Sequence, residues 1–194
     1  MAKREATPLE AALKAERIGQ YIRLRGGYPV PLAGAIYWAA LGALGYSTDL
    51  AGWANIAFPA SGLIFPLALV LAAVFRKPFM KDRSAVGGVM LPAFISMLLF
   101  WVFIVAAIVE APALVPLLLA VGMSLHWPVI GWSYGRTLLY SAHAVVRALL
   151  ALYIFIAYPE HRLTWLPFSV ALVYLATIAA IYVDSGRLAK KAAT

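Results

Sequence analysis

The stretch "PALVPLLLAVGMSLHWPVIGWSYGRTLLYSAHAVVRALLALYIFIAY", residues 112–158, decides the fold. It contains two apolar runs, residues 112–133 and 137–158. A helix of about 20 such residues crosses the hydrocarbon core of a bilayer, which is about 30 Å thick. The pair Tyr134–Gly135 separates the two runs and suits a turn. The stretch therefore predicts two antiparallel membrane-spanning helices joined by a tight connection.

The rest of the chain has the same apolar character. Hydrophobic residues make up 64% of the 194-residue sequence and charged residues only 12%, whereas soluble domains are about 45–50% apolar. Four further runs reach the length of a membrane span, at residues 29–46, 58–75, 86–109 and 163–184. Together with the hairpin, they predict an all-α membrane protein with six transmembrane helices.

The second of these spans contains helix-breaking residues, Pro59, Gly62 and Pro66. Membrane helices tolerate such residues where neighbouring helices satisfy the freed backbone groups. The chain is accordingly expected to have three parts: an N-terminal helix and glycine hinge at 1–27, a six-span bundle at 28–185, and a basic tail at 186–194.

The basic residues are distributed unevenly around the predicted spans. An even number of crossings returns the chain to its starting side, so both ends and every second loop share one face. All 16 Lys and Arg residues except Arg147 and Arg162 lie on that face, and loops rich in Lys and Arg remain in the cytoplasm. This pattern predicts a multi-pass protein of the cell (inner) membrane with both termini cytoplasmic. The positive charges flank apolar runs, which argues against nucleic acid as a partner.

Residues 1–27 are expected to form a cytoplasmic amphipathic helix that ends at a hinge. Thr7, Pro8 and Glu10 are typical of a helix start with a capping box, and Gly26–Gly27 provide the hinge. The helix could lie on anionic headgroups or fold back on the bundle. It could also dock a partner protein, and the sequence does not separate these alternatives.

Ionisable residues gather inside the predicted hairpin. His126 and His143 each lie about 13 Å from the turn at 1.5 Å per residue, so they are expected at nearly equal depth on neighbouring helices. Arg147 is one helical turn deeper, on the same face as His143. A charge at that depth costs at least about 2.5–3.5 kcal/mol, so Arg147 should face the bundle interior or water.

No acidic residue is expected at the depth of Arg147, since all eight Asp and Glu residues fall at or beyond the ends of the spans. Its partner should be a backbone carbonyl, a hydroxyl, an aromatic face or an external anion. Pro128 is expected to kink the helix and free the carbonyl of Ser124, with the Ser124 hydroxyl nearby. Three interpretations remain open: a structural clasp, an anion site in which the histidines titrate, and an arginine that reaches an interface.

The candidate site for a substrate or anion lies between the fourth and fifth spans. It comprises Ser124, His126, Trp132, Tyr134, Tyr140, His143 and Arg147, with Pro128 as the structural kink. We expect no cofactor, although two histidines could hold a b-type haem. We also predict no metal site and no catalytic residue, because carboxylates are missing at this depth and the chain has no cysteine.

The segments "GLIFPLALVLAAVFRKPF", "LLFWVFIVAAIVEAPALV" and "VGMSLHWPVIGWSYGRTLLYS" follow one another within residues 58 to 150. Their order resembles a bacterial family of six-helix membrane proteins catalogued as a domain of unknown function. In that family a His-x-Pro motif followed by Trp and Tyr closes the fourth helix, and His126, Pro128, Trp132 and Tyr134 look like these positions. The resemblance implies a six-helix bundle and no particular activity.

The polar site favours a transporter or channel for a small solute or ion, with an anionic small ligand as the candidate. We expect a homo-oligomer in the lipid bilayer, because six short helices leave little room for an internal path. One alternative is a non-transporting membrane subunit or sensor that acts through the N-terminal helix. Another is a membrane enzyme for an anionic or lipid-linked substrate.

Overall fold

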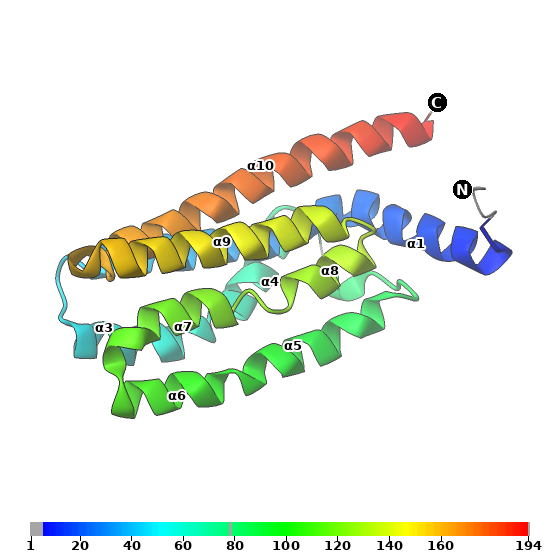
Figure 1. Ribbon diagram of the computed structural model, residues 1–194. Coiled ribbons are helices and arrows are strands. Elements are labelled where there is room, and N and C mark those ends of the chain that lie inside the picture. The colour runs from blue at the N-terminus through cyan, green and yellow to red at the C-terminus, as the bar shows by residue number, and fades with distance from the viewer. Residues whose placement is uncertain (1–5, 78, 194) are drawn as a thin grey trace.

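The computed structural model describes residues 6–77 and 79–193. Helices dominate these residues and no strand occurs among them (Figure 1). The α-helices are α1 (Pro8–Leu24), α2 (Pro29–Leu44), α3 (Leu50–Ser61), α4 (Ile64–Val74), α5 (Met90–Leu99), α6 (Trp101–Glu110), α7 (Val115–Gly122), α8 (Trp127–Ser133), α9 (Thr137–Ala157) and α10 (Trp165–Ala193). Single 3-10 turns lie at Arg25–Gly27, Phe79–Lys81, Gly87–Val89, Pro112–Leu114 and Pro159–His161. The prediction of an all-α protein is confirmed.

Four helical segments are long and apolar enough to cross a membrane: Gly87–Glu110, Pro112–Ser133, Thr137–Ala157 and Trp165–Ala193. The pair α3 and α4, bent by 51°, makes a fifth if it counts as one broken span. The first predicted span corresponds to α2, which has only 16 residues, whereas membrane helices use about 17–25. The structure thus supports four or five spans. The sixth span, and the cytoplasmic placement of both termini, stay predictions.

The second predicted span, residues 58–75, differs most from the structure. The helix begins at Leu50, because the Asp49 carboxylate accepts the N–H of Gly52 (2.8 Å) and caps it. Pro59 lies inside this helix, and the chain bends before α4 begins. This region is therefore two short helices rather than one continuous span.

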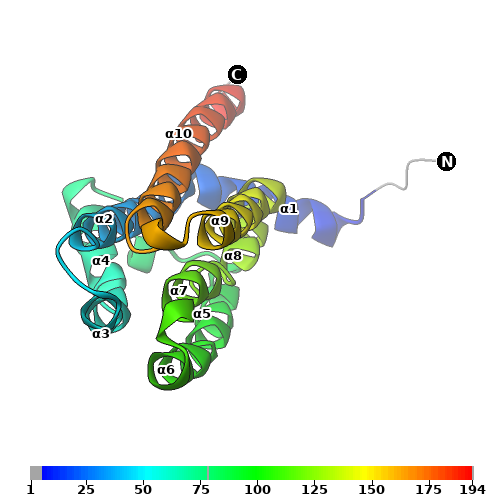
Figure 2. The same cartoon turned by 60° about the vertical axis from the view of Figure 1, so that its left-hand side comes forward.

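The helices are arranged in two layers (Figure 2). One layer holds α2, α10 and α9, with α8 lying against α9. Glycine allows α2 and α10 to approach closely, because a Cβ on Gly34 would lie 2.7 Å from the Tyr174 ring and one on Gly42 would lie 2.8 Å from Phe168. The second layer is divided, with α3 and α4 below α2 and with α5, α6 and α7 below α9 (Figure 2).

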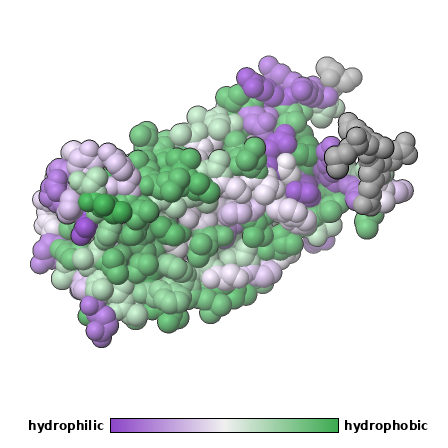
Figure 3. Space-filling model, viewed as in Figure 1, coloured by the Kyte–Doolittle hydropathy of each residue, from purple (hydrophilic) through white to green (hydrophobic). Residues whose placement is uncertain are grey.

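Apolar side chains cover the middle of the face seen in Figure 3, and polar side chains gather toward its two ends. Large exposed apolar residues are spread over α4, α5, α6 and α9. A surface that faces hydrocarbon must be apolar over the height of the bilayer core. The helices and this surface are consistent with an integral membrane protein.

The helix α1 begins with the predicted capping box. The N–H of Thr7 donates to Glu10 Oε2 (2.7 Å), and the N–H of Glu10 donates to Thr7 Oγ1 (3.3 Å). Gln20, Tyr21 and Leu24, near the other end of α1, are buried. Of the alternatives for this helix, folding back on the bundle is therefore what its last turns do.

The predicted hinge is a tight corner. Arg25, Gly26 and Gly27 have φ of 47°, 63° and 62°, a left-handed backbone that glycine enters without steric cost. A Cβ on Gly26 would lie 2.9 Å from Tyr140 Oη, and one on Gly27 would lie 2.6 Å from Tyr134 Oη. The Tyr140 hydroxyl also donates to the carbonyl of Gly26 (2.6 Å). The corner is thus held by the bundle.

Gly26→Ala is expected to lower the free energy of unfolding by about 1–3 kcal/mol, because the methyl group is both crowded and strained. Gly186→Ala in α10 is the matched control, since its Cβ would meet nothing within 4 Å. That variant should be neutral or stabilised by about 0.5–1 kcal/mol. Thermal unfolding in one detergent measures both. Equal melting temperatures would contradict the tight corner.

Candidate functional site

The fourth predicted span is broken into α7 and α8 beside the predicted histidine. Pro128 lies in the first turn of α8, where a proline has no helical hydrogen bond to lose. The carbonyl of Ser124 accepts the N–H of Trp127 (3.1 Å), and the Ser124 hydroxyl donates to the carbonyl of Val121 (2.6 Å). The expected kink is a run of turns at residues 123–126 that interrupts the α-helix within one span. Both Ser124 groups bond within this segment rather than to Arg147.

This break places a row of rings between α8, α9 and α10. The ring centroids of His126 and His143 lie 5.5 and 4.5 Å from the indole of Trp127. His143 also lies 4.7 Å from the ring of Tyr174, and its Nδ1 is 2.8 Å from Thr177 Oγ1. Both predicted histidines therefore contact the same indole.

Arg147 lies next to this row and has no solvent exposure. Its Nη1 donates to Tyr174 Oη (2.6 Å). Its guanidinium carbon lies 5.3 Å from the ring centroid of Trp38 and 5.1 Å from that of Tyr174. No ion pair joins it to a carboxylate within residues 6–77 and 79–193. A hydroxyl and two aromatic faces hold the charge, and both partner types were among those predicted.

Several buried polar atoms of the site, two of them in Arg147 itself, have no hydrogen-bond partner in the described part of the chain. They are Arg147 Nε and Nη2, His126 Nδ1, His143 Nε2, and the indole nitrogens of Trp38, Trp101 and Trp127. Leaving one buried donor unpaired costs about 1–3 kcal/mol. So many together are expected where a protein takes up water or a ligand.

A deep cavity of about 350 Å³ lies beside the row of rings, between α4, α5, α8 and α10. Three of its lining residues carry unpaired nitrogens, namely Trp101, His126 and Trp127. Tyr174, the hydrogen-bond partner of Arg147, lines it as well. The volume falls at the lower end of the range for small-ligand pockets, about 300–1,000 Å³.

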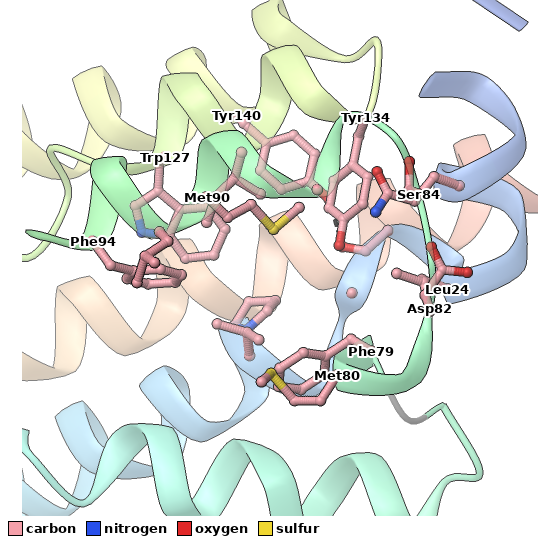
Figure 4. A pocket seen from close by; sticks show the side chains of 18 of the residues that line it. Leu24, Phe79, Met80, Asp82, Ser84, Met90, Phe94, Trp127, Tyr134 and Tyr140 are labelled. Carbon is pink, nitrogen blue, oxygen red and sulfur yellow. Dashed lines mark hydrogen bonds between the residues drawn. The ribbon is translucent and has the colours of Figure 1, made fainter. Parts of the chain in front are cut away.

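A mouth cavity of about 400 Å³ adjoins the deep cavity and extends toward α1. In Figure 4, Asp82 and Ser84 lie at one end of it, and Phe94 and Trp127 lie at the other. Both cavities share the lining residues Val30, Phe65, Leu91, Phe94 and Trp127. The two cavities therefore lie next to each other, one toward α1 and the other beside the row of rings.

Arg23 of α1 lies over the polar end of the mouth cavity. Its Nε and Nη2 donate to the two oxygens of Asp82 (3.0 and 3.2 Å), and these hydrogen bonds raise the pKa of Arg23. The Arg23 side chain is 47% exposed, and an exposed ion pair contributes only about 0–1 kcal/mol. This ion pair therefore contributes little to stability.

The remaining predicted site residues lie in different places. Tyr134 and Tyr140 are buried and line the mouth cavity. Trp132 lies near the surface, where Arg17 donates to its carbonyl and covers its ring at 4.5 Å. Ser124 is buried and lines neither cavity. The structure thus brings His126, Tyr134 and Tyr140 to the cavities.

Sequence reasoning missed four residues that complete the site, three of them aromatic. Tyr174 and Thr177 are three residues apart in the last span, and such polar groups on one helix face were a usable signal. Trp38 and Trp101 carry no comparable signal, because tryptophans also occur at membrane interfaces.

The fold and the site together define a class: a bundle of apolar helices with a buried arginine and a row of aromatic rings beside two adjacent cavities. The chain belongs to a family of unknown function, DUF7010, whose profile matches residues 13–184. The resemblance to an uncharacterised family is thereby confirmed. No curated protein and no solved structure matches the chain, so the geometry has to carry the functional argument.

The contact between Arg147 and Tyr174 predicts a strong coupling of the two side chains. Tyr174→Phe should cost about 1–3 kcal/mol of stability, because it leaves a buried guanidinium donor unpaired. In an Arg147→Met background the same change should cost much less, since no charge remains to be satisfied. Thermal unfolding of the unsubstituted protein, the two single variants and the double variant gives this double-mutant cycle. Tyr182→Phe on the exposed part of α10 serves as the control, and equal costs in both backgrounds would refute the coupling.

Proposed function

We propose that the protein is a membrane carrier for a small organic anion. The observation that carries this proposal is Arg147, a fully buried arginine without an ion pair to any described carboxylate. Charged residues inside a membrane are costly and usually mark substrate or ion pathways. An anion in the neighbouring cavity would balance this charge.

The two joined cavities support a path for such a solute. The mouth cavity begins at the end of the bundle where α1 and the last turns of α10 lie (Figure 1). Basic residues gather there, among them Arg17, Arg187 and Lys190. Arg23 pairs with Asp82, the carboxylate that lines the mouth cavity. The remaining excess of positive charge raises the local concentration of anions near the mouth. The proposed orientation places this end in the cytoplasm.

The path ends at groups suited to hold an anion. Indole N–H groups donate only, and Trp127 lies where the two cavities meet. Hydrogen bonds to a charged acceptor contribute more than neutral ones, about 1.5–3 kcal/mol each. The deep cavity therefore offers an anion hydrogen bonds in addition to the field of Arg147.

Arg147→Met removes the charge while keeping a long apolar side chain. We expect it to reduce anion-dependent current or uptake in proteoliposomes at least about tenfold, because the positive charge that favours an anion in the deep cavity is lost. Arg147→Lys should retain part of the flux, because lysine keeps the charge but lacks the planar fork. Arg187→Met removes an exposed charge from α10 and should transport normally. Undiminished flux in folded Arg147→Met would disprove the proposal.

Leu91→Trp tests the path without touching the buried charge. Leu91 lines both cavities and is 67% exposed, so the larger side chain can narrow the path without disturbing the core. Flux should fall severalfold. Leu99→Trp is the matched control, because Leu99 lies on the same helix, is 66% exposed and lines neither cavity. Equal transport by the two variants would argue against a route through these cavities.

A further inference from the structure

We infer that the substrate is a small carboxylic acid with an apolar body, whose carboxylate is held in the deep cavity by Trp101 and Trp127. The inference rests on the proposed function and names its substrate class. It combines three features of the deep cavity: its unpaired donors, the single positive charge beside it, and the exposed apolar edge between α4 and α5.

The unpaired donors define the polar end of the ligand. Trp101 Nε1 and Trp127 Nε1 are buried and unpaired in the described chain, and both residues line the deep cavity. The Trp127 nitrogen lies on the side of its ring toward Phe94 (Figure 4). Because an indole nitrogen only donates, the facing ligand atom has to accept. A carboxylate has two oxygens and can accept from both indoles.

Tyr174 provides a third donor and links the ligand to Arg147. Its hydroxyl oxygen accepts the hydrogen bond from Arg147 Nη1, which leaves its own hydrogen available to a ligand. Since Tyr174 lines the deep cavity, the positive charge acts on the cavity through a polarised hydroxyl. The charge reaches the ligand without direct contact with the guanidinium.

The charge balance limits the ligand to one negative charge. Arg147 is the cation that touches Tyr174, and the lining of the deep cavity contains neither Lys nor Arg among the described residues. A second negative charge would have no counterion in an apolar surrounding, where an unpaired charge is very costly. A monocarboxylate fits this balance, whereas a phosphate dianion does not.

The edge of the deep cavity defines the apolar end of the ligand. Phe65 of α4 and Leu91 and Leu98 of α5 line the cavity and are 45%, 67% and 44% exposed. They lie in the divided layer of Figure 2, where α4 and α5 belong to different halves. An apolar ligand body that packs against these side chains is removed from water, which favours binding. A carboxylate without such an apolar body lacks this contribution.

Calorimetric titration of the protein in phosphatidylcholine nanodiscs tests the inference. The probes are cyclohexanecarboxylate, its neutral analogue cyclohexylmethanol, and acetate, which lacks the apolar body. We expect cyclohexanecarboxylate to bind at least about tenfold more tightly than either, since the charge-assisted contacts and the apolar burial each contribute that much. Binding is measured without any transport step.

Trp101→Phe keeps an aromatic side chain, although a smaller one, and removes the N–H group. It should weaken cyclohexanecarboxylate roughly tenfold and leave cyclohexylmethanol within about twofold. Trp165→Phe is the matched control, because Trp165 stacks on His161 outside both cavities. Leu98→Trp, which fills the cavity from its exposed edge, should abolish binding of both ring compounds and provides a second test if Trp101→Phe fails to fold.

Equal affinity for acid and alcohol, or unchanged acid binding in both Trp101→Phe and Leu98→Trp, overturns the inference. Selective binding of the acid without any flux overturns the carrier function and leaves the binding site standing. Arg147-dependent flux of chloride or phosphate, without binding of cyclohexanecarboxylate, supports the carrier and overturns the carboxylic acid as its substrate.

Discussion

The hydrogen bond between Arg147 and Tyr174 is the constraint on which the rest of this structure depends. It joins α9 to α10, and the indole of Trp38 brings in α2 through the face of the same guanidinium. A charge in an apolar interior is tolerated only when nearby groups replace its hydration. The contacts that stabilise the Arg147 charge therefore link the three helices of the first layer. His143 and Thr177 repeat the link between α9 and α10 one turn away.

The cavities follow from how this layer meets the broken fourth span. Since α7 stops before Trp127, the short helix α8 turns that indole toward the histidines and Tyr174. The aromatic rings are rigid and leave gaps between them that flexible aliphatic side chains would fill. The divided second layer leaves the other side of these gaps lined by α4 and α5. The same break that interrupts the helix thus creates a chamber with donors on its wall.

Sequence reasoning succeeded where the determining interactions are local. The capping box at Thr7 and Glu10 depends on residues three apart. The helices α9 and α10 were predicted from the apolar composition of their segments. It was less successful where a distant contact decides. The end of α2 after 16 residues has no such local signal. Asp49, by contrast, caps α3 through Gly52, three residues away, and this local signal was overlooked. The partner of Arg147 lies 27 residues away, and composition gives no rule for choosing among several tyrosines.

The corner at Gly26 and Gly27 joins α1 rigidly to the wall of the mouth cavity. Both glycines line that cavity, and Tyr134 and Tyr140 press against them. The bend that directs α1 and one wall of the mouth cavity are thus made by the same residues. The shape of the cavity at this end is therefore tied to the direction in which the first helix leaves the bundle.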